Sequence, residues 1–96
     1  MLKMVMIVYN EALDLEVTES LEGIAKNYTK ITAAYGRGES SGTHLGNDIW
    51  PGRNNILYIA CEEKEAQQIL GRVKELRKKI GHEGAKAFLL PLEEMT

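Results

Sequence analysis

The chain has 96 residues, of which 44% are hydrophobic and 27% are charged, and its formal net charge is −2. This length fits one domain, the apolar content is too high for a disordered chain, and the slight acidity argues against a general nucleic-acid binder. The single cysteine, Cys61, excludes a disulfide within the chain and a paired-cysteine metal motif. No apolar run is long enough for a membrane helix or a secretory signal, so we expect a cytoplasmic protein without membrane insertion.

The first half of the chain predicts a strand, a helix and a second strand. Residues 2–9 are apolar at both alternating sets of positions, which is typical of a strand buried on both faces. Residues 13–25 predict a helix, for which Asn10 or Asp14 offers a side-chain cap. Residues 28–36 are rich in side chains that favour an extended chain. The apolar stripe of the helix consists of Leu13, Val17, Leu21 and Ile24.

A glycine-rich segment then separates the two halves. Residues 37–53 show little periodicity and predict an exposed loop, which is usually functional when it is this long in so small a domain. Residues 54–61 predict a third strand, again apolar on both sides. Residues 62–80 predict a second helix with an acidic start, a basic end and Gly81 as its C-cap. Residues 85–90 predict a fourth strand, which Pro91 ends.

The predicted order of elements is βαββαβ over residues 1–96. Right-handed crossovers place both helices on the same face of one four-stranded antiparallel sheet. This is the ferredoxin-like sandwich, a single α+β domain. Two helices cover only one face, whereas the first and third strands are apolar on both faces. We therefore expect further copies of the chain to cover the second face.

Three short segments follow a known family pattern. Residues 13–17 read Leu-Asp-Leu-Glu-Val, residues 35–38 read Tyr-Gly-Arg-Gly, and residues 86–94 read Lys-Ala-Phe-Leu-Leu-Pro-Leu-Glu-Glu. They resemble the Leu-Asp-Glu-Val, Gly-x-Gly-Arg and Gly-Lys-Ile-Phe-x-x-Pro-Val-Glu-Glu segments of the PII signal-transduction family and its PII-like relatives. The resemblance covers nearly the whole chain. It implies a homotrimer whose sheets face inward, with residues 37–53 in the place of the family's regulatory T-loop.

The resemblance also implies a small effector bound between subunits. Members of the family bind ATP or ADP in intersubunit clefts, where the phosphates meet a glycine-lysine turn and the base of the T-loop. Carried over, Gly36 and Gly38 lie at the loop base and Lys86 is the phosphate lysine. The sequence departs from the family at Ala85, which replaces the glycine before the lysine, and it has no tyrosine in the loop and no arginine after Glu94. We therefore expect a divergent PII-like protein rather than a standard nitrogen sensor.

The loop residues themselves suit an anion. Glycines let backbone N–H groups converge, hydroxyls donate hydrogen bonds and an arginine neutralises charge, although a plain hairpin connection explains the same residues equally well. The only tryptophan, beside Pro51, is typical either of an interface anchor or of a ring that packs on its own loop. The candidate ligand-binding residues are Gly36, Arg37, Gly38, Ser40, Ser41, Thr43 and Lys86, and the candidate partner-binding residues are His44, Trp50 and Arg53.

We therefore expect a PII-like regulatory trimer that binds ATP, ADP or another anion and acts on a regulated enzyme or transporter through residues 37–53. The alternative is a metal-responsive trimer similar to CutA proteins, with His44, Asp48 and His82 as ligands, although their spacing matches no known ligand motif. We do not expect an enzyme, because no Ser/His/Asp or Cys/His set is recognisable. An acylphosphatase is disfavoured because residues 9–11, Tyr-Asn-Glu, stand where that family has its glycine-rich motif.

Overall fold

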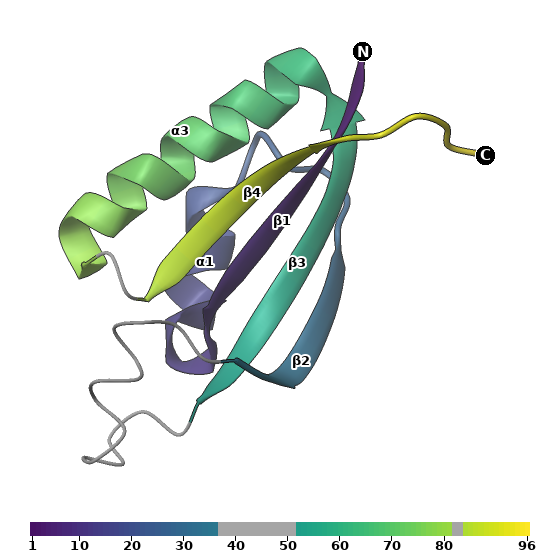
Figure 1. The fold of residues 1–96 in the computed structure, drawn as a ribbon. Coiled ribbons are helices and arrows are strands. Elements are labelled where there is room, and N and C mark those ends of the chain that lie inside the picture. Colours follow the sequence, from purple (N-terminus) through teal and green to yellow (C-terminus); the bar gives the residue numbers. More distant parts are fainter. Residues whose placement is uncertain (37–51, 82–83) are drawn as a thin grey trace.

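The computed structural model describes residues 1–36, 52–81 and 84–96. The strands form one antiparallel sheet in the order β2-β3-β1-β4, and both α-helices cover the same face of it (Figure 1). The predicted ferredoxin-like α+β fold is therefore confirmed, with the first and third strands in the centre. The elements are β1 (Leu2–Asn10), the 3₁₀ helix η1 (Glu11–Leu13), α1 (Asp14–Ser20), β2 (Thr29–Tyr35), β3 (Arg53–Glu62), α3 (Glu63–Ile80) and β4 (Ala85–Pro91).

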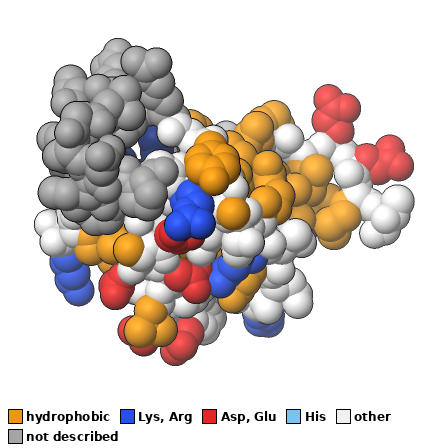
Figure 2. All heavy atoms as spheres, turned by 90° about the horizontal axis from the view of Figure 1, so that it is seen from below, with side chains coloured by type: hydrophobic (Ala, Val, Ile, Leu, Met, Phe, Trp, Pro, Cys, Tyr) orange, Lys and Arg blue, Asp and Glu red, His pale blue; other side chains and the backbone are white. Residues whose placement is uncertain are grey.

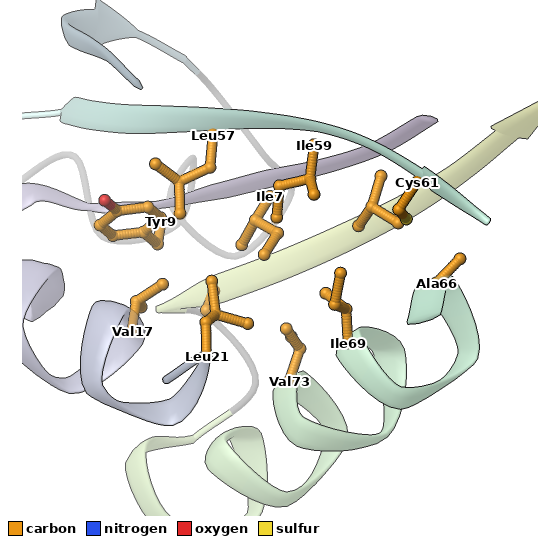
Figure 3. Close-up of a cluster of buried hydrophobic side chains, with 12 residues drawn as sticks. Ile7, Tyr9, Val17, Leu21, Leu57, Ile59, Cys61, Ala66, Ile69 and Val73 are labelled. Carbon is orange, nitrogen blue, oxygen red and sulfur yellow. The ribbon is translucent and has the colours of Figure 1, made fainter. Parts of the chain in front are cut away.

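The hydrophobic core lies between the helices and one face of the sheet. Side chains of successive strand residues point to opposite faces, so every second residue of β1 and β3 enters this core. From the helices, the predicted stripes meet these side chains, as Figure 3 shows. The buried members are Val5, Ile7, Tyr9, Val17, Leu21, Leu57, Ile59, Cys61, Ala66, Ile69, Val73 and Ala85.

The other face of the sheet, which we call the open face, is also apolar. The strand registers place Met6 of β1 between Tyr58 of β3 and Phe88 of β4 on this face. Phe88 and Leu90 are 38% and 42% exposed, although large apolar side chains are normally buried. In Figure 2 hydrophobic side chains form a band that leads toward the projecting end of the chain. The apolar side chains of the open face are Ile31, Met4, Met6, Val8, Ile56, Tyr58, Ala60, Phe88 and Leu90.

The first helix differs from the prediction. A single helix over residues 13–25 was expected, but the chain forms η1 and then only two turns of α1. The side chain of Asn10 caps η1, because its Oδ1 accepts a hydrogen bond from Ala12 N at 2.9 Å. The helix ends early because a turn follows Ser20 and Gly23 adopts a positive φ of 85°, which the apolar spacing does not reveal.

The second helix follows the prediction closely. It has acidic residues in its first turn and Arg77, Lys78 and Lys79 in its last. Gly81 adopts a φ of 95° and donates its backbone N–H to the Arg77 carbonyl at 2.9 Å, so it ends the helix as expected. Among residues 1–36, 52–81 and 84–96, no helix combines the length and the apolar composition that a bilayer span requires.

The edge strand β2 contains an irregularity. Its pairing with β3 shifts between Ile31 and Ala34, and Ala33 between them has a φ of 57°. A left-handed backbone is unfavourable for an alanine, by about 1 kcal/mol. Such bulges are frequent at sheet edges, where they bend a strand and end its regular pairing.

Candidate ligand site at the loop end of the sheet

Two predicted ligand residues lie at one end of the sheet, which we call the loop end, beside Gly52 and Gly84. Gly36 follows β2, and its backbone N–H donates to the Gly52 carbonyl at 3.4 Å. A Cβ on Gly36 would lie 3.1 Å from Asn54 Nδ2, which is closer than ordinary van der Waals contact. A glycine at this position therefore lets the two sides of the loop base approach closely.

Lys86 lies on β4 near the same end. It pairs with Val8 of β1, so its side chain belongs to the open face and is exposed. The turn that precedes it is tied to β1, because the Asn10 backbone N–H donates to the Gly84 carbonyl at 2.9 Å. Lys86 Nζ lies 5.6 Å from the centre of the Phe88 ring, which is within the range of a cation–π contact. The ammonium group is therefore held near the open face and remains accessible to an anion.

Gly36 and Lys86 do not meet within one chain. Strands β2 and β4 form the two edges of the sheet, with β3 and β1 between them. Three strand spacings of about 4.8 Å put the edges roughly 14 Å apart. Lys86 is level with Ile56 of β3 whereas Gly36 is level with Gly52, so the two residues lie farther apart than the edges do. One phosphate group cannot contact both residues of the same chain.

Arg53, a predicted partner-binding residue, is the first residue of β3 rather than the last residue of a loop. Its Nε lies 3.5 Å from Oε1 of Glu11, and both side chains are well exposed to solvent. The pair therefore links the base of the loop to η1. The remaining candidates lie outside the described residues: Arg37, Gly38, Ser40, Ser41, Thr43, His44, Asp48, Trp50 and His82.

The structure adds a polar cluster that the sequence patterns did not single out. The carboxylate of Asp14, the first residue of α1, accepts hydrogen bonds from the Tyr9 hydroxyl at 2.5 Å and from Asn55 Nδ2 at 3.2 Å. Lys30 Nζ lies 2.9 Å from Oδ1 of the same carboxylate and 3.0 Å from Oδ2. Asp14 was expected only as a cap or as a partner of the helix dipole. In the fold it joins α1 to three strands of the sheet.

Electrostatics at this cluster favour an ionised carboxylate. The hydrogen bond from Lys30, followed by the one from Tyr9, lowers the pKa of Asp14. Burial raises the pKa of the Tyr9 hydroxyl, and its hydrogen bond to Asp14 acts in the same direction. At neutral pH the cluster therefore holds an ionised carboxylate and a protonated phenol, an arrangement that suits structural anchoring.

The described side chains include an exposed lysine near the loop end, Lys86, and no cluster that could hold a metal ion. Within the part of the chain that the structure covers, no three His, Cys, Asp or Glu side chains gather as a metal site requires. Burial raises the pKa of the one cysteine, Cys61, which therefore remains a thiol.

The comparisons with known proteins give structural neighbours only. No family model matches the sequence, and no curated protein matches it. A protein of Thermus thermophilus assigned as a PII-like signalling protein is 29% identical, with 92% of this chain and 82% of that one covered and a TM-score of 0.64. CPII from Thiomonas intermedia, solved with ADP, AMP and acetate, is 17% identical, with 93% and 83% covered and a TM-score of 0.68.

A further structure of CPII, a nitrogen regulatory PII-like protein, contains ADP, AMP and bicarbonate. It is 20% identical to this chain, with 92% and 82% of the chains covered and a TM-score of 0.67. The likeness to CPII concerns the fold, whereas the Thermus protein adds a higher sequence identity over nearly the same span. The resemblance that the sequence motifs indicated is thus confirmed: the chain is similar to PII-like signalling proteins in its fold and, to the Thermus protein, also in its sequence.

Proposed function

We propose that this chain is a PII-like regulator rather than an enzyme. It forms a homotrimer, binds an adenine nucleotide or a similar anion between subunits, and acts on a protein partner through residues 37–53. The observation that best supports this proposal is the position of Gly36 and Lys86 on opposite edges of a sheet whose open face is apolar.

The open face supports self-association. Both α-helices cover the other side of the sheet (Figure 1), so a monomer would leave the open face in water. Large contiguous apolar patches on a soluble protein usually mark an interface. A second copy of the chain offers the same apolar chemistry, and the family resemblance favours three copies around the contact.

The edge positions support a site between subunits. In a ring every contact is head-to-tail, and in the proposed trimer the β2 edge of one subunit meets the β4 edge of the next. Gly36 of one copy then approaches Lys86 of its neighbour, although within a chain the two residues lie on edges roughly 14 Å apart. The site is complete only in the assembly.

The chemistry of the site favours a phosphate-bearing ligand. Lys86 supplies a positive charge, and the loop base supplies a close backbone approach at Gly36. The CPII structures contain ADP and AMP, so adenine nucleotides are the first ligands to test. Regulation further requires that the ligand favours one arrangement of the partner-binding surface over another.

Two measurements test the proposal. Light scattering at micromolar concentration should give the mass of three chains, and Phe88→Asp on the open face should give a smaller species. Leu15→Asp is the matched control, because Leu15 is 64% exposed but lies on α1 rather than on the open face. A wild-type mass of one chain would refute the assembly.

Titration calorimetry tests the ligand. ADP, AMP or ATP should release heat with the wild-type protein, and Lys86→Gln should weaken the binding at least tenfold. Lys74→Gln, which removes an exposed lysine of α3, should leave the affinity unchanged. If none of the three nucleotides binds, the nucleotide part of the proposal is wrong and only the proposed assembly remains.

A further inference from the structure

The segment from Asn10 to Asp14, which we call the bridge, lies at the loop end, between Gly84 on one side and the Gly36–Gly52 contact on the other. It contains the last residue of β1, all of η1 and the first residue of α1. The Asn10 side chain caps η1 and its backbone N–H binds the Gly84 carbonyl, so the bridge is fixed at its start. The Asp14 carboxylate fixes its other end to β1, β2 and β3.

One side of the bridge packs tightly on the turn before Lys86. A Cβ added to Gly84 would lie 2.6 Å from Cδ1 of Leu13 and 3.5 Å from Cδ1 of Ile80. The first distance is far below van der Waals contact, so Leu13 rests directly against the glycine backbone. Because the Asn10 backbone N–H also donates to the Gly84 carbonyl, Gly84 contacts the bridge at two points, Asn10 and Leu13.

The opposite side of the bridge reaches the base of residues 37–53. Glu11 pairs with Arg53 at 3.5 Å, and Arg53 lies opposite Tyr35 where β2 and β3 end their pairing. The next backbone contact outward is the hydrogen bond from Gly36 to Gly52. Asp14 adds a second connection through Asn55, two residues along β3 from Arg53.

We propose that the bridge couples the start of β4, at Gly84 and Lys86, to the Gly36–Gly52 contact, so that a ligand on Lys86 is detected at the base of residues 37–53 of the same subunit. The ligand part of this statement rests on the proposed function, whereas the mechanical coupling does not. Two arrangements are required. In one, Leu13 rests on Gly84 and Glu11 holds Arg53; in the other, η1 is displaced and both contacts loosen. Coupling of this kind is reciprocal, so a change at either end must appear at the other.

Amide hydrogen exchange of the ligand-free protein tests the coupling in the first direction. Gly84→Ala should push Leu13 away and make the Gly36 amide exchange about two- to fivefold faster, which is the effect expected from loosening an exposed ion pair. Adding Leu13→Ala removes the clash and should restore the wild-type rate at Gly36. Lys74→Gln, which changes an exposed side chain of α3, is the control and should leave the exchange rate of the Gly36 amide unchanged.

The reverse direction uses a variant that introduces no clash. Arg53→Gln breaks the pair with Glu11 and should make the Asn10 amide, which binds the Gly84 carbonyl, exchange about two- to fivefold faster. Lys78→Gln is the matched control, since it breaks an exposed pair with Glu75 at 3.2 Å on α3.

Unchanged exchange at Asn10 in Arg53→Gln would overturn the coupling. An equal rise in the exchange rates of the Asn10 amide and of the Cys61 amide, at the far end of β3, would also overturn the coupling, because that result indicates global destabilisation. The exchange data need no nucleotide, so they separate a failure of the coupling from a failure of ligand binding.

Discussion

The carboxylate of Asp14 is the clearest point at which one side chain determines the stability of this fold. Asp14→Asn keeps the size of the side chain and removes its charge. Tyr9 and Asn55, which are 1% and 5% exposed, then lose an ionised acceptor. Lys30 meets an amide in place of a carboxylate.

The magnitude follows from the contacts. A hydrogen bond to a charged group contributes about 1.5–3 kcal/mol. Two buried donors on Asp14 therefore contribute about 3 kcal/mol at the lower end of that range, which is appropriate because the Asp14 side chain is 39% exposed and its charge is screened. An asparagine oxygen retains one neutral hydrogen bond of about 1 kcal/mol. We expect Asp14→Asn to lower the free energy of unfolding by about 2 kcal/mol.

The pH dependence provides an independent check. The folded state lowers the pKa of Asp14 from its ordinary value of 3.8. A carboxyl whose pKa is lowered by folding stabilises the protein above its unfolded-state pKa, and this contribution is lost as the pH falls through the folded-state pKa. The difference in free energy of unfolding between wild type and Asp14→Asn should therefore have its full size at pH 7 and decrease below about pH 4.

Urea unfolding at one fixed protein concentration measures both effects, because an assembly makes the midpoint depend on concentration. Glu16→Gln is the matched control: it removes an exposed acidic side chain from the same first turn of α1 and should change stability by less than about 0.5 kcal/mol. In a Tyr9→Phe background, Asp14→Asn should lower the free energy of unfolding by less, because the hydrogen bond from the Tyr9 hydroxyl is already absent. Equal effects of Asp14→Asn and Glu16→Gln at pH 7 would refute the assignment.

Three further predictions concern other features of the fold. Gly71→Ala should raise the free energy of unfolding, measured in urea, by about 0.5–1 kcal/mol, because the site has space for a methyl group and glycine is a poor helix former. A loss of stability would show that the added methyl group meets a neighbour beside α3. Ala33→Gly should also raise the midpoint, by about 0.5 kcal/mol, because it relieves the φ of 57°, and an unchanged or lower midpoint would contradict this. The Cys61 thiol is 9% exposed, and burial raises its pKa. It should therefore react with a thiol reagent only as fast as the protein opens. Rapid labelling of the native protein would contradict the buried position of Cys61.

Much of this fold could be predicted from apolar periodicity. The double apolar pattern of residues 2–9 and 54–61 identified the two central strands, and the charge asymmetry with Gly81 located α3. The break between η1 and α1 could not be predicted in this way, because Leu13 and Val17 keep helical spacing across a change of helix type. Backbone geometry at a helix start depends on caps and turns that leave the apolar stripe intact.

The candidate site was less accessible to sequence reasoning. Lys86 was identified by the family motif and lies exposed on the open face, while its role as a ligand residue stays a prediction. The Asp14 cluster gave no local signal, because Lys30 and Asn55 lie 16 and 41 residues away along the chain. Contacts of this kind follow from the topology, which brings β2 and β3 beneath the start of α1 only once the sheet has formed.

Folding and the proposed binding depend on opposite faces of the same sheet. The core and the Asp14 cluster lie on the helix face and are complete within one chain. The proposed ligand site uses the open face and requires two sheet edges that a single chain keeps roughly 14 Å apart. A substitution such as Phe88→Asp should therefore abolish nucleotide binding while the isolated subunit keeps its helix-face core. Asp14→Asn should instead weaken the fold, because the contacts of Asp14 lie on the helix face. A variant that lost binding and folding together at Phe88 would show that the open face is needed for the fold itself.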